Sequence, residues 1–80
     1  MQANEIDTRV REVLAVALQT EVPPTGPFSR ADQPKWDSLK HVEMIFVLED
    51  EFGVQFEEAD FVKLDSVDNI VKLVEGRIAA

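Results

Sequence analysis

The chain has 80 residues, with 16 acidic side chains against 8 basic ones and a formal net charge of −8 at pH 7. This length predicts one domain, residues 1–80, with a thin core. The lack of cysteine excludes a disulfide framework, a thiolate metal site and a cysteine nucleophile, and a single histidine excludes a multi-histidine metal site. We therefore expect a small acidic protein that is not an enzyme and has no metal site of its own.

Charge and hydropathy also indicate which partners to expect. An acidic surface repels phosphate backbones and attracts basic protein surfaces, so proteins rather than nucleic acids are the expected partners. No apolar run approaches the ~20 residues of a membrane span, and the first residues lack the basic and apolar regions of a signal peptide. The sequence thus predicts a cytoplasmic, monomeric protein with no membrane span.

The first half of the chain predicts one helix and one long loop. Apolar residues at helical spacing predict a helix over residues 4–19, with Asn4 as its cap. Residues 21–35 contain all four prolines of the chain and one glycine, which predicts a long loop with little regular structure. We expect Phe28 to pin this loop to the core.

The second half predicts three more helices. One is expected to begin at Asp37 or Ser38, to end at residue 51 or 52 and to stop at Gly53. Residues 57–64 predict a short helix, and residues 67–77 predict the last one, with a cap at residue 65 or 66. The fold class is therefore all-α: a small four-helix bundle of three longer helices and one short helix, with a long loop after the first.

The second helix carries apolar residues on two faces. One arc of about 100° is wide enough to be the core face; it consists of Met44, Ile45, Leu48 and Phe52. A second apolar stripe lies roughly opposite, at helical spacing, and consists of Leu39, Val42 and Phe46. We define these three residues as the apolar stripe.

Two interpretations of the apolar stripe are open from the sequence. It could pack against the long loop, under Phe28 or Trp36, or it could be exposed and dock partner proteins. Acidic residues flank it at Glu43, Glu49 and Asp50. An apolar centre with a charged rim is typical of transient interfaces, which favours a docking surface for basic partners.

The segment Trp36-Asp37-Ser38-Leu39 stands where the long loop meets the second helix. Asp37 or Ser38 is a good helix cap, and a hydroxyl at a helix N-terminus lies where a phosphate is favoured. Here the sequence resembles the acyl carrier protein family, which includes peptidyl and D-alanyl carrier proteins. The resemblance covers nearly the whole chain; its motifs are Asp37-Ser38-Leu39, Val42-Glu43, Leu48-Glu49-Asp50-Glu51-Phe52-Gly53-Val54 and Ser66-Val67-Asp68-Asn69-Ile70.

This resemblance implies a cofactor and its attachment point. Ser38 is expected to carry 4′-phosphopantetheine through a phosphodiester, transferred from coenzyme A by a phosphopantetheinyl transferase that uses Mg²⁺. Asp37 is expected to orient the metal and the phosphate during this loading. The arm's terminal thiol then holds an acyl or aminoacyl group as a thioester, so the chain itself needs no cysteine.

The resemblance also implies a function and a set of partners. The chain is expected to deliver its cargo to enzymes of fatty-acid, polyketide, nonribosomal-peptide or related biosynthesis. Docking is expected through Leu39, Val42 and Phe46, with Glu43, Glu49 and Asp50 contacting basic partner residues. The positions that match the family's interior are Met44, Leu48, Phe52, Phe56, Phe61 and Leu64.

Departures from the family pattern narrow this expectation. Many fatty-acid carriers have glycine where this chain has Trp36 and an acid where it has Lys40, which favours a discrete carrier of a specialised pathway. The alternative from another class is an unmodified acidic adaptor that binds partners through the second helix. A hydrolase built on Asp37, Ser38 and His41 is not expected, because the sequence has no Gly-x-Ser-x-Gly elbow.

Overall fold

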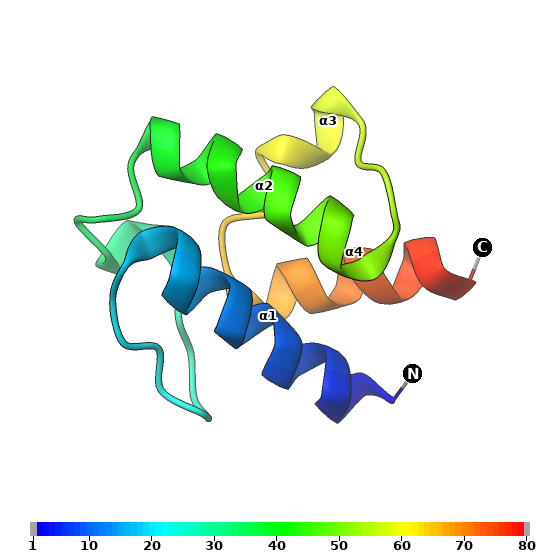
Figure 1. The fold of residues 1–80 in the computed structure, drawn as a ribbon, viewed down its shortest axis with the longest axis horizontal. Helices are drawn as coiled ribbons and strands as arrows, with labels where there is room; N and C mark the ends of the chain where they lie inside the picture. The colour runs from blue at the N-terminus through cyan, green and yellow to red at the C-terminus, as the bar shows by residue number, and fades with distance from the viewer. Residues whose placement is uncertain (1, 80) are drawn as a thin grey trace.

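A computed structural model describes residues 2–79, which fold into four α-helices and one 3₁₀ turn. The elements are α1 (Ala3–Leu18), η1 (Arg30–Asp32), α2 (Ser38–Phe52), α3 (Glu58–Phe61) and α4 (Val67–Ala79). The prediction of an all-α bundle with three longer helices and one short one is confirmed. Helix α1 packs against both α2 and α4, and the two ends of the chain lie on the same side of the molecule (Figure 1). Within residues 2–79, no helix is both long and apolar enough to cross a membrane.

Helix α1 begins earlier than the sequence predicted. Gln2 occupies the cap position, and its carbonyl accepts the backbone N–H of Ile6 at 3.0 Å. Asn4 therefore lies inside the first turn, and the prediction that it caps the helix is wrong. Its backbone carbonyl instead accepts a hydrogen bond from Thr8 Oγ1 at 3.0 Å. The reason is that the residues before Asn4 supply a backbone carbonyl from which the helical ladder can start.

The core joins the apolar faces of the three longer helices. Its fully buried members are Ile6, Val10, Leu14 and Leu18 of α1, Met44, Ile45 and Leu48 of α2, Val67, Ile70 and Val74 of α4, and Leu64 between α3 and α4. The core face predicted for α2 is thus confirmed, and Phe52 packs against it while partly exposed. Helix α2 then ends at Gly53, whose φ of 64° lies in the left-handed region that favours glycine.

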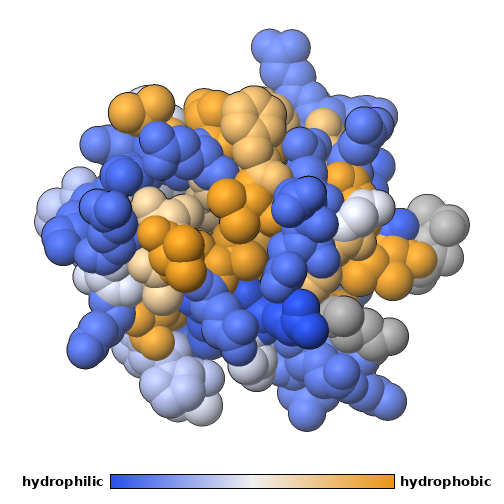
Figure 2. All heavy atoms as spheres, viewed as in Figure 1, coloured by the Kyte–Doolittle hydropathy of each residue, from blue (hydrophilic) through white to orange (hydrophobic). Residues whose placement is uncertain are grey.

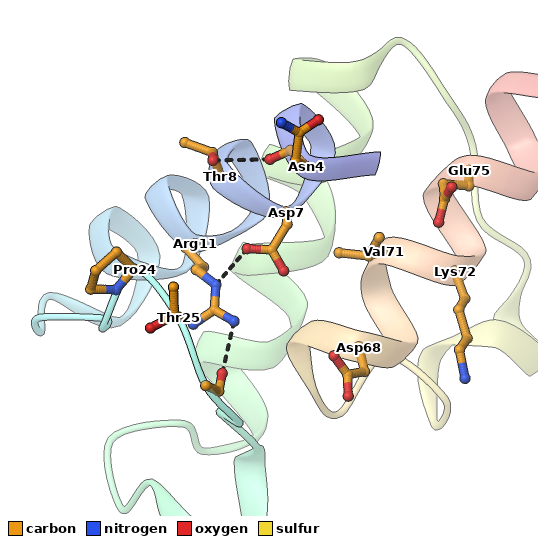
Figure 3. Close-up of a pocket in the computed structure, with 11 residues that line it drawn as sticks. Asn4, Asp7, Thr8, Arg11, Pro24, Thr25, Asp68, Val71, Lys72 and Glu75 are labelled. Carbon is orange, nitrogen blue, oxygen red and sulfur yellow. Dashed lines mark hydrogen bonds and ion pairs between the residues drawn. The ribbon is translucent and has the colours of Figure 1, made fainter. Parts of the chain in front are cut away.

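The loop between α1 and α2 is held to this core at several points. Phe28 is buried as predicted, and its ring stacks on that of Trp36 with centroids 6.1 Å apart. Arg11 of α1 donates hydrogen bonds to the carbonyls of Pro23 and Gly26, both at 2.7 Å. These contacts border a groove between α1, the loop and α4 (Figure 3). The loop is long but ordered, because side chains satisfy its backbone carbonyls.

A buried carboxylate joins the short helix α3 to α4. Asp60 is 6% exposed; it accepts the backbone N–H of Glu57 at 3.0 Å and a hydrogen bond from the Arg77 guanidinium. The backbone hydrogen bond from Glu57, together with the charge and hydrogen bond of Arg77, lowers the pKa of Asp60 below its ordinary value of 3.8, although burial opposes this. The charged form of Asp60 therefore stabilises the packing of α3.

We expect Asp60→Asn to lower the free energy of unfolding at pH 7 by about 1–3 kcal/mol, because Arg77 and the Glu57 N–H lose a charged acceptor. The pKa of Asp60 is depressed by folding. The stability it contributes is therefore present above the unfolded-state pKa and is lost as the pH falls through the folded-state pKa. In urea unfolding, the gap between wild type and variant should shrink below about pH 4. A gap of constant size down to pH 3 would contradict this account.

Candidate functional site

The N-terminus of α2 presents a serine hydroxyl to solvent. Asp37 caps the helix: its Oδ1 accepts the backbone N–H of Lys40 at 2.9 Å, and its carbonyl accepts that of His41 at 2.9 Å. Ser38 is therefore the first residue of the helix, and it is exposed. The first turn of a helix leaves backbone N–H groups without helical partners and carries a partial positive charge, so this position favours an anion.

A cationic side chain from the loop lies beside this hydroxyl. Arg30 Nη2 is 3.4 Å from Ser38 Oγ, and Arg30 Nε donates to the carbonyl of Trp36 at 3.1 Å. Arg30 is not among the site residues predicted from the sequence. The sequence contains only a weak signal for it: Arg30 is the one arginine in the proline-containing loop, and it lies in a stretch with no periodic pattern.

A buried polar network lies on the inner side of this site. His41 is 7% exposed, its Nδ1 accepts from Trp36 Nε1 at 2.9 Å, and its Nε2 lies 2.7 Å from the carbonyl oxygen of Phe61. An indole nitrogen only donates and a carbonyl only accepts, so both bonds form when the imidazole is neutral with its proton on Nε2. The network connects the residue two before Ser38 to the end of α3.

His41 consequently does not serve as a base for Ser38. Both of its ring nitrogens are engaged, one by Trp36 and the other by Phe61. Trp36, which is 2% exposed, anchors the loop to the core. The arrangement is a structural support beneath the serine rather than a catalytic triad.

The apolar stripe of α2 is open to solvent. Leu39 is 68% exposed, Val42 40% and Phe46 61%. The alternative in which the stripe packs under the loop is wrong, because Phe28 and Trp36 turn inward and stack on each other in the core. Figure 2 shows hydrophobic side chains from the upper edge to the middle of the view, interspersed with hydrophilic ones.

The three acidic residues that flank the stripe have different surroundings. Glu43 and Asp50 are exposed, and Glu43 forms an ion pair of 3.6 Å with Lys40. Glu49 is half-buried, and its Oε2 accepts the backbone N–H of Phe56 at 2.8 Å, which holds the segment after α2. Two of the three acids are thus available at the surface, while the third already stabilises the fold.

Comparison with known proteins defines the class to which this site belongs. Residues 4–74 match the family described as "Phosphopantetheine attachment site". The chain belongs to this family of carrier proteins, so it is not an enzyme, and its prosthetic group is covalently attached 4′-phosphopantetheine.

Within this class the chain is similar to acyl carrier proteins. It is 32% identical, over 81 aligned positions that span both chains completely, to the acyl carrier protein of Thermosynechococcus vestitus (strain NIES-2133 / IAM M-273 / BP-1). The role of an acyl carrier with an attached phosphopantetheine follows from the family, and it argues against the alternative of an unmodified adaptor.

The residues at the start of α2 fit such a group. A phosphodiester needs a hydroxyl to which it can be joined and a surrounding that accepts negative charge. Ser38 offers an exposed hydroxyl at the first residue of the helix, and Arg30 offers a guanidinium beside the same oxygen. This site therefore combines an exposed hydroxyl with a neighbouring guanidinium in a strongly acidic chain.

We expect His41→Phe to keep the packing at this position but to lower the free energy of unfolding by at least about 2 kcal/mol, because Trp36 Nε1 and the Phe61 carbonyl lose buried partners. Thermal unfolding of both proteins measures the loss. In the wild type, ¹⁵N NMR of the His41 ring should show a protonated Nε2 and an unprotonated Nδ1 at neutral pH. A ring with its proton on Nδ1 would contradict the network.

Proposed function

We propose that Ser38 is the attachment residue of 4′-phosphopantetheine and that the protein carries acyl or aminoacyl groups to biosynthetic enzymes. One observation carries this assignment: an exposed serine hydroxyl at the first residue of α2, with the Arg30 guanidinium beside it. The arm supplies a terminal thiol on which the cargo is held as a thioester. Ser38 holds the arm outside the core, where successive partner enzymes have access to it.

Loading makes Ser38 the nucleophile of a phosphoryl transfer. Its Oγ forms a bond to the phosphorus of coenzyme A that bears the pantetheine, the bond from that phosphorus to the departing 3′-phosphorylated adenylate breaks, and the hydroxyl proton passes to a base of the transferase. Mg²⁺ stabilises the charge on the phosphates during this step. Asp37 uses Oδ1 for the helix cap, which leaves Oδ2 to orient the Mg²⁺ and phosphate at the transferase interface.

The apolar stripe is the proposed docking surface for the transferase and for the acyl- or aminoacyl-transferring enzymes. Leu39 directly follows the attachment residue, and Phe46 lies further along the same helix. Glu43 and Asp50 are the proposed contacts for basic partner residues, with Glu49 contributing negative charge from its half-buried position. Such a charged rim around an apolar strip steers basic partners towards Ser38.

The pathway that we propose is a specialised one, served by a discrete monomeric carrier in the cytoplasm. Support comes from Trp36 and Lys40, which replace the glycine and the acid of many fatty-acid carriers. Both have a place in this fold: Trp36 binds His41, and Lys40 pairs with Glu43. The segment around the serine therefore differs from that of many fatty-acid carriers, which supports a distinct set of partners.

Attachment is tested by intact mass after incubation with coenzyme A, Mg²⁺ and a broad-specificity phosphopantetheinyl transferase. We expect a gain of one phosphopantetheine in the wild type and none in Ser38→Ala. Ser66→Ala is the matched control, because Ser66 also places its hydroxyl at a helix N-terminus, where it accepts the backbone N–H of Asn69 at 3.2 Å. A folded wild type that gains no mass, or a Ser38→Ala protein that does, would refute the assignment.

Docking is tested by Phe46→Ala in the same loading reaction. We expect kcat/KM of the transferase for the carrier to fall about tenfold, since an exposed aromatic anchor at an interface typically contributes 1–2 kcal/mol. The free energy of unfolding should change by less than about 0.5 kcal/mol, because the side chain is exposed. Val16→Ala on α1, where the side chain is 74% exposed, is the control that should leave kcat/KM unchanged. Equal kcat/KM for Phe46→Ala and wild type would exclude the stripe from docking the transferase.

A further inference from the structure

We propose that Arg30 binds the phosphodiester of the phosphopantetheine group and holds the base of the arm against the loop before α2. This inference rests on the proposed attachment at Ser38. It assigns a binding role to a residue outside α2, eight positions before the serine in the chain. The ligand is a phosphate monoanion, and its partner is the forked donor set of a guanidinium.

The position of Arg30 is fixed by its backbone. Its N–H donates to the Asp65 carbonyl at 2.8 Å, and its carbonyl accepts the N–H of Gln33 at 3.1 Å. The preceding residue, Ser29, pairs with Ser66 across an antiparallel bridge. The turn η1 is thus tied to the connection between α3 and α4, so the start of the Arg30 side chain is set by the fold.

The guanidinium is then directed towards Ser38. Its Nε donates to the Trp36 carbonyl at 3.1 Å, and its Nη2 lies 3.4 Å from Ser38 Oγ. The Trp36 indole is in turn fixed by His41. Arg30 Nη2 already contacts Ser38 Oγ, the atom to which the phosphorus would be bonded. The non-bridging oxygens of the phosphodiester therefore come within reach of the guanidinium N–H groups.

The charge of Arg30 is the second observation that points to an anion. The other three arginines each pair with a carboxylate; the pairs are Arg9–Glu51, Arg11–Asp7 and Arg77–Asp60. Within residues 2–79, Arg30 forms no ion pair and contacts only neutral oxygens. In a chain with 16 acidic side chains, a guanidinium without a carboxylate partner is a ready site for an added phosphate.

A purely structural role makes a different prediction. If Arg30 only holds the loop through the Trp36 carbonyl, its replacement lowers the free energy of unfolding of the unloaded and the loaded protein by the same amount. If Arg30 binds the phosphodiester, its replacement lowers the free energy of unfolding of the loaded protein by more, because only the loaded protein contains the phosphate. The difference between the two losses isolates the contact between Arg30 and the phosphate.

The experiment is therefore a cycle of urea unfolding on unloaded and loaded protein for wild type, Arg30→Gln and Arg30→Lys. Arg9→Gln is the control with the same charge change; its partner Glu51 lies 13 residues beyond Ser38 in α2, about 20 Å away along the helix. Loading is confirmed by mass before each measurement. We expect loading to raise the folding equilibrium constant of wild type about two- to fivefold relative to that of Arg30→Gln, as for a partly exposed ion pair. Arg30→Lys should retain part of this effect, and Arg9→Gln all of it.

The ³¹P resonance of the loaded protein gives a second measurement that does not depend on stability. We expect its chemical shift to move towards that of free phosphopantetheine diester in Arg30→Gln and to stay at the wild-type value in Arg9→Gln. In wild type it should move in the same direction as NaCl is raised, because salt screens the ion pair. This titration tests the contact in the wild type if Arg30→Gln does not fold.

The outcomes are distinct. The role of Arg30 is overturned if Arg30→Gln loses the same free energy of unfolding in its unloaded and loaded forms. It is also overturned if neither salt nor the Arg30 variants change the ³¹P chemical shift. Neither result overturns the attachment at Ser38. A wild type that gains no phosphopantetheine, or gains it at another residue, overturns both.

Discussion

The two hydrogen bonds of the His41 imidazole are the constraint on which the site depends. One ring nitrogen fixes the Trp36 indole and the other holds the Phe61 carbonyl at the end of α3. Because Trp36 is held in place, its carbonyl can accept a hydrogen bond from Arg30 Nε, and the Arg30 guanidinium then lies beside Ser38 Oγ. A neutral imidazole, which carries one donor and one acceptor, is suited to join a donor on one side to an acceptor on the other.

Polar tethers of this kind complement a core that is small. The apolar faces of α1, α2 and α4 bury against each other, but the loop and the four-residue helix α3 have few apolar residues to contribute. Besides Phe28 and Trp36, they are held by Arg11, by His41 and by the pair of Asp60 with Arg77. Within residues 2–79, every buried side-chain nitrogen or oxygen has a hydrogen-bond partner, so these tethers carry no uncompensated desolvation.

The sequence predicted the features that depend on local pattern. The periodicity of apolar residues located the helices, Gly53 ended α2 where a left-handed residue was needed, and Asp37 capped it. Asn4 failed as a cap because a cap residue and an interior polar residue look alike in sequence. Contacts between distant segments left no local signal: Arg30 meets Asp65, and His41 meets Phe61 twenty residues away. The residues that support the site were therefore found only in the structure, whereas the serine that we propose for attachment was selected from its motif.

The arrangement of α2 explains how a protein without cysteine can serve a reaction sequence. The proposed attachment residue and the apolar stripe lie on one helix, and Phe46 is about 12 Å along the axis from Ser38. A partner that docks on the stripe therefore finds the base of the arm at a set distance and direction, which raises the effective concentration of the tethered cargo at its active site. An arm held by Arg30 at its phosphate loses freedom at its base only, so the thiol end remains able to enter the partner. Docking specificity and reach are thus divided between a rigid helix and a long cofactor, and the chain itself needs no catalytic group.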